Sequence, residues 1–278
     1  MFYQSGILLR SSALRFPRVA HGFSTRLGGV STDPATAEMN LAFGREDPDA
    51  VVYENIGIFA RAVTDGRYGG ERVICAPQIH SDKIRYATPA DAGDGVTRRS
   101  ADDEGFDGFI TDKPGVILTV RVADCVPILF AGEKEDGAPA VAAVHAGWRG
   151  TVAGIAARAV EKLAALGVPK SGIRAAVGPH VGACCFEVKD DFRDAVRTAR
   201  GAGFASRHIK DRGGSLYADL TGMNLEILAE AGIKEGQIDV DADCTACRPD
   251  LFHSHRKTGG RRGAMGAAVA ILDEETAL

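Results

Sequence analysis

Three short and nearly unbroken apolar runs in the middle of the chain constrain its fold more than any other feature. They cover Gly115–Val122, Cys125–Phe130 and Pro139–His145. Apolar runs of this length are typical of buried β-strands. The charged and glycine-rich segments Asp91–Gly105 and Gly132–Pro139 predict surface loops before the first run and before the third. A chain with this pattern must bury a β-sheet in its interior.

A helix and a further strand are predicted directly after the third run. Residues 151–167 read TVAGIAARAVEKLAALG, with Gly167 as the C-cap of a helix. Their apolar residues recur at helical spacing. These residues are Val152, Ile155, Ala159, Val160, Leu163 and Leu166. Gly172–Gly178 predicts the next strand, so Ala140–Gly178 should form a strand-helix-strand crossover, which is normally right-handed and joins parallel strands.

The remaining segments predict an α+β class rather than a purely doubly wound sheet. Val188–Arg200 and Asp219–Gly232 have helical patterns, and Met265–Leu272 has the pattern of a closing buried strand. Hairpin-like segments in Val73–Ala87 indicate antiparallel pairing. Because the sequence contains no internal repeat and no Pro/Ser-rich linker, residues 1–278 are expected to form a single domain of mixed β-sheets packed against helices.

Composition and charge favour small molecules as ligands. The 278 residues are 45% hydrophobic and 25% charged, and the net charge is -4 with a pI near 6.0. This balance gives no electrostatic reason to expect nucleic acid or an acidic membrane surface as a partner. No apolar run reaches the roughly eighteen residues that a membrane span needs. The sequence does not identify a protein partner.

The cysteines favour a reducing, cytoplasmic location. Six cysteines are too sparse for a disulfide scaffold, and the apolar patch Gly6–Leu9 is too short for the core of a secretory signal. Three arginines give the N-terminal segment a faint likeness to a transit peptide, but a strand and a loop are the favoured interpretation. The adjacent thiols of Cys184 and Cys185 are expected to serve packing, with one facing a pocket, rather than to form a disulfide.

The segment Val141–Gly150, VAAVHAGWRG, places reactive and bulky side chains where a strand should end and a helix should begin. The strand is predicted to end at His145. Free backbone N–H groups and the helix dipole near Gly150, with Arg149 beside them, could bind an anion such as phosphate. An ordinary tight turn explains the same residues. For Trp148 we expect packing under the turn.

Two histidines and one cysteine form a candidate zinc site. His80, Cys125 and His145 each lie at a predicted strand end. Two imidazoles and one thiolate are good zinc ligands, and three protein ligands leave the fourth tetrahedral position for water or substrate. Each residue alone has a structural explanation. A free cysteine often packs in the core, and a lone histidine is more often a hydrogen-bonded structural residue. No local template such as HExxH is present, so both interpretations stay open.

Two further motifs have both a functional and a structural interpretation. Cys244 and Cys247 form a CxxC motif that could hold a structural metal with His253 or His255, but a second cysteine pair at zinc-ribbon spacing is absent. The HxH pattern of these two histidines is also found at copper sites, although a strand places alternate residues on one face for many reasons. In HGFSTRLGGVS, Arg26 and the hydroxyls could bind phosphate or ribose, or form a surface turn.

Seven separated segments, in this order, resemble one family across nearly the whole chain. They are HGFSTRLGGVS, MNLAFG, QIHSDKI, ADCVPILF, AVHAGWRGT, GPHVGACCFEV and DCT with DLFHSHR. The chain resembles the laccase-domain family, long labelled polyphenol oxidase and now understood as zinc-dependent purine nucleoside enzymes. The resemblance implies a single-domain α+β fold, with zinc ligands at His80, Cys125 and His145.

The resemblance also implies two reactions. One is phosphorolysis of adenosine, inosine, guanosine and S-methyl-5'-thioadenosine to the free base and (methylthio)ribose 1-phosphate. The other is deamination of adenosine to inosine. A zinc ion with an open position can lower the pKa of water or polarise a bound group, and basic turns can hold an anion. We expect Arg26 or Arg149 to hold phosphate and Asn40 to contact substrate.

Two departures from the family pattern bear on these expectations. Members often carry a histidine where this chain has Phe43, which affects the ligand contacts expected from Asn40–Gly44. The late motif of the family usually has an aromatic residue where this chain has His253 and His255. These extra imidazoles could take up adventitious copper without any oxidase function.

Three other functions would use the same residues. Cys125 could be the nucleophile of a cysteine hydrolase or deamidase, with His145 as its base. A copper-dependent phenol oxidase needs many more paired histidines than the seven present. A metal-binding module without catalysis would act through a partner, for which the sequence offers no coiled coil or basic tail. Metal dependence separates the thiol enzyme from the nucleoside enzyme.

Overall fold

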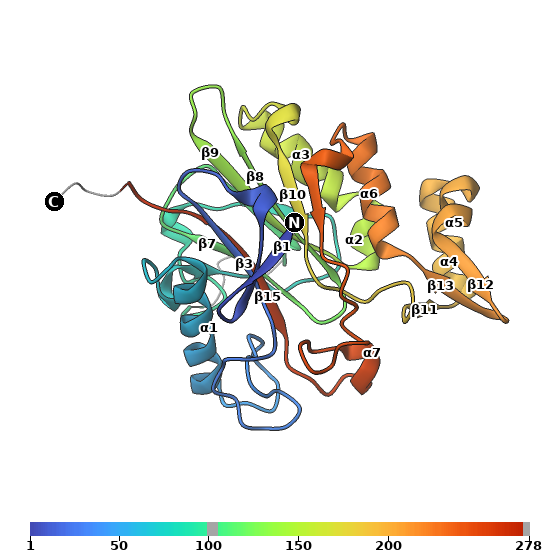
Figure 1. Cartoon of the computed structure of the whole chain (residues 1–278), viewed down its shortest axis with the longest axis horizontal. Coiled ribbons are helices and arrows are strands. Elements are labelled where there is room, and N and C mark those ends of the chain that lie inside the picture. Colours follow the sequence, from blue (N-terminus) through green and yellow to red (C-terminus); the bar gives the residue numbers. More distant parts are fainter. Residues whose placement is uncertain (99–104, 275–278) are drawn as a thin grey trace.

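The computed structural model describes residues 1–98 and 105–274, and in these ranges two six-stranded sheets form the centre of the protein (Figure 1). The first sheet contains, in spatial order, β1 (Phe2–Ser5), β2 (Leu8–Ser11), β3 (Val19–Ser24), β15 (Met265–Ile271), β7 (Ile117–Val122) and β4 (Val73–Ile74). The second contains β14 (Ile238–Val240), β10 (Arg174–Val177), β8 (Val126–Glu133), β9 (Pro139–Ala146), β6 (Gly108–Thr111) and β5 (Ile84–Tyr86). A small third sheet contains β11 (Glu187–Val188), β13 (Ser215–Ala218) and β12 (Ile209–Arg212).

Helices cover the outer face of each large sheet. On the first sheet the buried side of α1 (Asp49–Val63) packs against β15 and β7. On the second sheet the covering helices are α2 (Trp148–Ala153), α3 (Ile155–Ala165) and α6 (Leu220–Glu230). The helices α4 (Asp190–Arg200) and α5 (Ala202–His208) lie with the third sheet at one end of the molecule, and α7 (His255–Thr258) is a single short turn (Figure 1). The predicted α+β architecture of mixed sheets and helices is confirmed.

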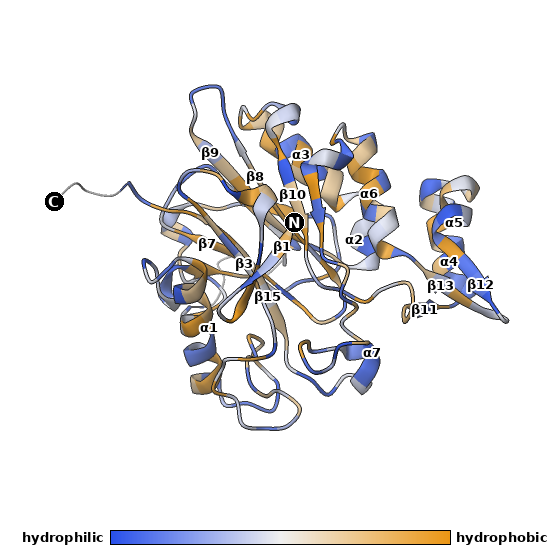
Figure 2. Cartoon of the chain, viewed as in Figure 1, coloured by the Kyte–Doolittle hydropathy of each residue, from blue (hydrophilic) through white to orange (hydrophobic). Residues whose placement is uncertain are grey.

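The two large sheets bury a common core, which explains the apolar runs. Alternate residues of a strand point to opposite faces. In β9, Val141 and Ala143 pack between the two sheets, whereas Ala142 and Val144 pack beneath the helices. Because both faces of this strand are covered, no polar alternation is possible. In Figure 2 the central strands accordingly have mostly the colour of hydrophobic residues.

The predicted crossover is present with two differences. Strands β9 and β10 run parallel, but β8 lies between them and pairs antiparallel with both. The helix predicted over 151–167 begins at Trp148 and is divided into α2 and α3 at Gly154. Gly154 has a φ of 88°, a left-handed conformation that glycine adopts without steric cost and that interrupts the helix.

Two other sequence expectations differ from the structure. The antiparallel pairing expected within Val73–Ala87 is wrong, because β4 and β5 belong to different sheets and each pairs parallel with its neighbour. Of the loop predicted over Asp91–Gly105, residues 99–104 lie outside the described ranges. In the described part, Asp94 and Val96 are buried rather than exposed. Asp94 accepts hydrogen bonds from arginine side chains, which fixes that part of the segment against the protein.

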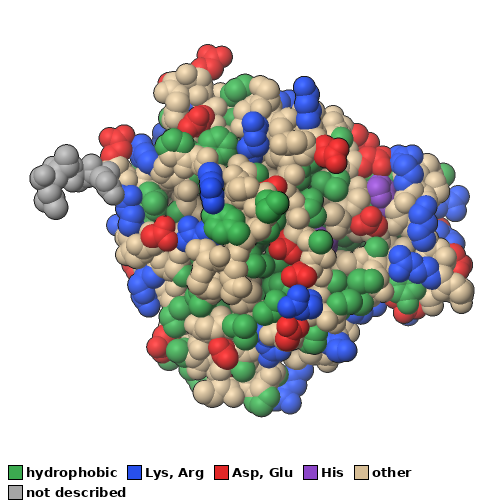
Figure 3. Space-filling view, viewed as in Figure 1, with side chains coloured by type: hydrophobic (Ala, Val, Ile, Leu, Met, Phe, Trp, Pro, Cys, Tyr) green, Lys and Arg blue, Asp and Glu red, His purple; other side chains and the backbone are tan. Residues whose placement is uncertain are grey.

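The surface carries charges of both signs. On the face that Figure 3 shows, acidic and basic side chains are interspersed rather than separated into two fields. This distribution agrees with the small net charge of -4. Within residues 1–98 and 105–274, no helix has both the length and the apolar character needed to cross a membrane.

Candidate metal centre and active site

His80, Cys125 and His145 meet at one end of the second sheet. Cys125 directly precedes β8, and His145 lies next to the end of β9. These two strands are antiparallel neighbours with Val126 opposite Ala146, so their register brings the thiol and the imidazole to the same place. His80 arrives from the loop between β4 and β5. The ligand atoms of the three residues lie within 4.8 Å of one another, and Cys125 Sγ is 3.8 Å from His80 Nε2.

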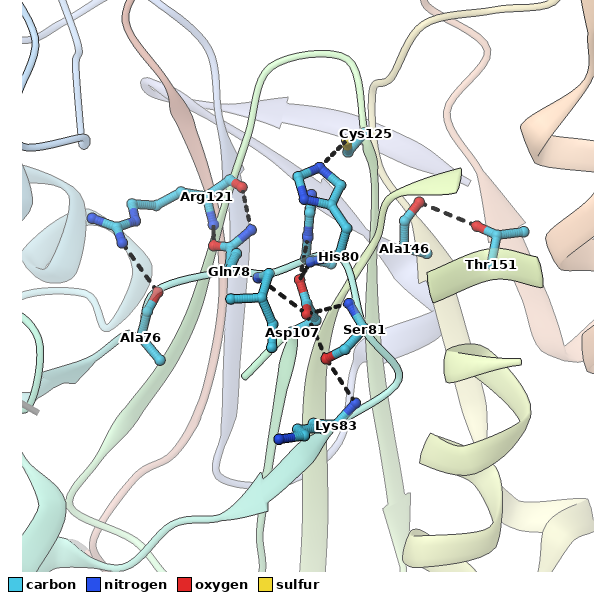
Figure 4. A network of polar contacts seen from close by, with 12 residues as sticks. Ala76, Gln78, His80, Ser81, Lys83, Asp107, Arg121, Cys125, Ala146 and Thr151 are labelled. Carbon is cyan, nitrogen blue, oxygen red and sulfur yellow. Dashed lines mark hydrogen bonds and ion pairs between the residues drawn. The ribbon is translucent and has the colours of Figure 1, made fainter. Parts of the chain in front are cut away.

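The buried carboxylate of Asp107 fixes two of these three residues (Figure 4). Its Oδ1 lies 2.8 Å from His145 Nδ1 and accepts the backbone N–H of His80 at 3.0 Å. Its Oδ2 accepts the backbone N–H and the hydroxyl of Ser81 at 2.6 and 2.7 Å. A carboxylate on one imidazole nitrogen orients the ring and leaves the other nitrogen for a metal. The ring of His145 therefore presents Nε2 as its ligand atom.

A second contact ties the His80 loop to the first sheet. The side-chain amide of Gln78 accepts the backbone N–H of Arg121 at 2.7 Å and donates to the carbonyl of the same residue at 2.8 Å (Figure 4). Arg121 belongs to β7 of the first sheet, whereas Asp107 directly precedes β6 of the second. The loop that carries His80 is thus held by both sheets.

Electrostatics favour an ionised thiol in this cluster. Burial by itself would raise the pKa of Cys125, but the hydrogen bonds and charges of His145 and His80 together outweigh burial and lower the pKa to about 6. Burial would likewise lower the pKa of His145, but the hydrogen bonds that its imidazole donates to Asp107 and Cys125, together with their charges, raise it to about 9. A thiolate near neutral pH is both a metal ligand and a nucleophile. The pair is compatible with zinc binding and with thiol chemistry.

Gly147 provides the space in which the three ligands meet. A Cβ at this position would lie 2.6 Å from His80 Cδ2 and 3.4 Å from Cys125 Sγ. A Cβ at Gly150 would lie 2.6 Å from the carbonyl oxygen of Ser81. Both glycines therefore allow a close approach between α2 and the His80 loop. We call the space beside Gly147 and Gly150 the cradle. Two imidazoles, one ionisable thiol and this cradle fit a tetrahedral zinc ion that keeps one position free.

The metal-ligand group faces a cleft of about 260 Å³. The other lining residues include one aromatic side chain, one amide and three arginines, which are Phe43, Gln78, Arg45, Arg121 and Arg262. The Nε of Arg262 is buried without a hydrogen-bond partner among the described residues. Burial and the nearby charge of Arg45 lower the pKa of Arg262. Clustered guanidinium groups with unused donors favour an anion such as phosphate.

Sequence reasoning did not identify Asp107 or these arginines. Asp107 could have been noted as an acid that directly precedes a short apolar strand, a position that would bury its charge. The three arginines come from segments far apart in the chain and show no common spacing. Only the fold brings them to one cleft.

Arg26 and Asn40 do not belong to the described residues that line the cleft. The guanidinium of Arg26 donates to carbonyl oxygens of two separate loops, at 2.8 and 2.9 Å. Asn40 is fully buried, and its side-chain oxygen accepts the backbone N–H groups of Ala42 and Ala264, each at 3.0 Å. Because Ala42 and Ala264 line the cleft, Asn40 shapes its wall. Direct substrate contact by Arg26 or Asn40 stays a prediction.

Arg149 and Trp148 also lie apart from the described cleft wall. Arg149 is exposed, and its guanidinium carbon lies 4.1 Å from the ring centroid of Trp148. The half-buried Trp148 ring packs against Phe192 with a centroid distance of 5.1 Å. These contacts fit the packing expected for Trp148. Phosphate binding by Arg149 stays a prediction.

The HxH pattern does not bring its two imidazoles together. His253 is buried, and its Nε2 lies 3.2 Å from the carbonyl oxygen of Met39. Burial, followed by the charge of Arg26, lowers the pKa of His253 to about 4, so the ring is neutral. His255 is exposed at the start of α7. Among the described residues, neither histidine belongs to a group that could hold a metal, and neither joins the CxxC motif.

Comparisons with known proteins cover most of the chain. The family model described as multi-copper polyphenol oxidoreductase laccase matches residues 20–272. A purine nucleoside phosphorylase, YlmD of Geobacillus stearothermophilus, is 34% identical over 275 residues and 96% of each chain. An adenosine deaminase, RL5 of an unknown prokaryotic organism, is 33% identical over 67% of this chain and 70% of its own. The crystal structure of Bacillus licheniformis hypothetical protein YfiH has a TM-score of 0.86 at 30% identity, covering 98% of this chain and 99% of that one.

Replacing Gly147 should disturb metal binding directly. We expect Gly147→Ala to lose about one zinc equivalent per chain, because the new Cβ would displace the ring of His80. Metal analysis of the purified protein measures the loss. Gly236→Ala is the matched control, since a Cβ there meets nothing within 4 Å. A Gly147→Ala protein with the zinc content of this control would contradict the role assigned to the cradle.

Replacing Asp107 should weaken the centre while leaving its ligands in place. Asp107→Asn removes the charge that orients His145, and we expect zinc affinity to fall about 10- to 100-fold. A competition titration with a chromophoric chelator measures this affinity. Asp112→Asn is the control, because Asp112 follows the opposite end of β6 and pairs with Lys134 at 3.0 Å. Equal affinities in the two variants would refute the orienting role.

Proposed function

The chain belongs to the multi-copper polyphenol oxidoreductase laccase family, and we propose that this member is a zinc-dependent purine nucleoside enzyme. It would catalyse phosphorolysis of adenosine, inosine, guanosine and S-methyl-5'-thioadenosine, and deamination of adenosine to inosine. The observation that carries the proposal is the position of the His80, Cys125 and His145 group in a cleft that three arginines also line. The phosphorylase and deaminase names of its relatives support it.

The chain's own residues would hold and orient the metal. His80, Cys125 and His145 would be the ligands, and Asp107 would keep the proton on His145 Nδ1 so that Nε2 faces the ion. A bound zinc ion supplies a Lewis acid with one open position, which activates water or polarises a substrate group. The exposed side of His80 would leave that open position facing the cleft.

Arg262 is the strongest candidate for holding phosphate. Its Nε has no partner among the described residues, and burial together with the like charge of Arg45 lowers its pKa. A phosphate between these groups would relieve their repulsion and accept paired N–H donors. Arg121 would be held in position for the same anion by its hydrogen bond to the carbonyl of Ala76, at 3.1 Å.

Phe43 offers a flat apolar surface for the purine. The half-buried ring lines the cleft, and the ring of Tyr53 supports it at a centroid distance of 4.9 Å. Aromatic rings stack on every kind of nucleobase, because each base has a π-face. This property would suit an enzyme that accepts several purine nucleosides, and it gives the residue that departs from the family pattern a function.

Copper oxidase chemistry is not the reaction that we propose. Of the seven histidines, only His80 and His145 join a metal-ligand group among the described residues. Four others are each bonded elsewhere in the protein. These contacts are His21 to the N–H of Ser11, His180 to the carbonyl of Gly178, His208 to Glu226, and His253 to the carbonyl of Met39.

A cysteine hydrolase or deamidase is the second candidate, because Cys125 and His145 favour a thiolate beside a protonated imidazole. The two functions differ in their need for metal. A nucleoside enzyme of this type loses activity when zinc is chelated and regains it when zinc is restored. The thiol mechanism would be favoured if the protein stayed active after treatment with a chelator and then lost its activity when an electrophile labelled Cys125.

The central experiment separates the two proposed reactions by their products. Metal-analysed protein is incubated with adenosine, with and without phosphate, and adenine, inosine and hypoxanthine are resolved by chromatography. We expect adenine only when phosphate is present and inosine in both cases, with both products abolished by chelation. Unchanged adenosine in the presence of zinc and phosphate would contradict the proposed function.

Replacing Arg262 should separate phosphate binding from the other steps. We expect Arg262→Gln to raise the KM for phosphate about 10- to 100-fold, as loss of hydrogen bonds to a charged group implies. Deamination to inosine needs no phosphate and should change little. Arg261→Gln is the control, because Arg261 is exposed and pairs with Glu46 at 3.0 Å. If Arg149→Gln raised the KM for phosphate and Arg262→Gln did not, the anion would bind at the start of α2 instead.

A further inference from the structure

Four cysteines outside the proposed active site lie together at a second place in the protein. Cys184 and Cys185 lie in the segment between β10 and β11, and Cys244 and Cys247 follow β14. Their four sulfur atoms lie within 4.8 Å of one another. Cys247 Sγ is 3.4 Å from Cys185 Sγ and 3.6 Å from Cys184 Sγ, and all four residues are free thiols. The fold thus supplies the second cysteine pair that the CxxC motif lacks in sequence.

The spacing of the sulfur atoms fits a tetrahedral metal. Zinc–sulfur bonds of about 2.3 Å place the sulfurs of a tetrahedral tetrathiolate site about 3.8 Å apart. The observed separations of 3.4 and 3.6 Å lie close to that value. A group of four thiolates offers soft ligands only and leaves no position for water, which is the donor set of a structural zinc site.

The surrounding backbone is shaped around these sulfurs. The N–H of Gly182 donates to Cys244 Sγ at 3.2 Å. A Cβ at Gly182 would lie 3.2 Å from Cys184 Sγ and 3.3 Å from Cys244 Cβ, so a larger residue would press on the group. Within the CxxC motif, the N–H of Cys247 donates to the carbonyl of Cys244 at 3.1 Å, which closes a tight turn. This turn brings the side chains of Cys244 and Cys247 to the same side of the backbone.

We propose that Cys184, Cys185, Cys244 and Cys247 hold one structural Zn²⁺ ion, separate from the metal centre at His80, Cys125 and His145. The proposal does not depend on the proposed function. The ion would join the segment after β10 to the segment after β14. It would also fix the point at which the chain leaves the two large sheets for the third sheet, α4 and α5 (Figure 1).

The two joined segments support the turn that precedes Cys125. The N–H of Val181 donates to the carbonyl of Asp124 at 2.9 Å, and the hydroxyl of Thr245 donates to Oδ1 of Asp124 at 2.6 Å. The N–H of Thr245 also donates to the carbonyl of His180 at 3.0 Å. Asp124 has a φ of 93°, a left-handed conformation that a non-glycine residue keeps only with such support. The four-cysteine site would therefore stabilise the backbone next to the catalytic metal centre.

Metal analysis of matched variants tests the proposal. We expect two zinc equivalents per chain in the unsubstituted protein and one in the double variant Cys184→Ser with Cys247→Ser. His80→Ala should also retain one equivalent, from the four-cysteine site. Cys75→Ala is the control, because Cys75 is a buried thiol outside both groups, and it should retain two. An unchanged zinc content in the double variant would overturn the proposal.

A measurement on the His80→Ala protein avoids dependence on the folding of the cysteine variants. Its remaining zinc is titrated out with an organomercurial, and released zinc and modified thiols are counted together. We expect about four protected thiols for each zinc ion released, as a tetrathiolate site requires. Thiols that react fully without releasing zinc would overturn the proposal. So would an intact mass, measured without reductant, that shows the four cysteines joined as disulfides and the protein free of metal.

The same experiments separate this inference from the proposed function. If His80→Ala retains one zinc equivalent and the double cysteine variant contains one equivalent less than the unsubstituted protein, the structural site is supported even when neither variant acts on nucleosides. Replacement of zinc by Co²⁺ in the His80→Ala protein provides a spectroscopic check. We expect the intense sulfur-to-cobalt charge-transfer absorption of a tetrathiolate site, and its absence would overturn the assignment of the ligands.

Discussion

The geometry of the candidate metal centre depends on the buried carboxylate of Asp107 and its hydrogen bonds. A buried charge is costly unless it is fully hydrogen-bonded, so the surrounding backbone must supply donors. Three successive N–H groups, from Ile79 to Ser81, and the hydroxyl of Ser81 do so. This requirement fixes the loop conformation, including the left-handed φ of 60° at His80. The backbone carbonyl of Asp107 also accepts the N–H of His145 at 2.7 Å, so one residue sets the positions of both histidines.

The centre also depends on the pairing of the central strands. Gly108 pairs with Val144, which places Asp107 beside His145, and the pairing of β8 with β9 places Cys125 on the other side. A shift of one residue in either register would turn the side chains to the opposite faces. Such a shift would exchange the residues that pack between the sheets, Val141 and Ala143, with those that pack beneath the helices, Ala142 and Val144. The apolar packing of the sheets and the chemistry of the cleft are therefore consequences of the same strand pattern.

The sequence predicted those parts of the structure that follow from local patterns. The buried strands were predictable from their unbroken apolar runs, and the crossover helix and α6 were predictable from the helical spacing of their apolar residues. The residue types of His80, Cys125 and His145 made the group a candidate zinc site, and the resemblance to the family singled it out. Cys125 and His145 do lie at strand ends, but His80 lies in the loop between β4 and β5 and not at the strand end predicted for it. Asp107 and Arg262 were not recognisable, since their significance lies in a hydrogen bond and a cleft formed between distant segments. The contact of Cys184 and Cys185 with the CxxC motif was missed for the same reason. The division of the helix at Gly154 was missed because a helical pattern of apolar residues does not reveal a positive φ.

Because the His80 loop is attached to both large sheets, a metal ion bound at the candidate site would contribute to the stability of the fold. Gln78 binds the loop to β7 of the first sheet. Asp107 and the other two candidate ligands, Cys125 and His145, lie in or next to strands of the second sheet. An ion bound at this junction would join the His80 loop to Cys125 and His145 of the second sheet, while Gln78 holds the same loop to Arg121 of the first. Binding to the native state alone stabilises that state in proportion to the logarithm of ligand concentration. A higher concentration of free metal would thereby raise the free energy of unfolding of the chain.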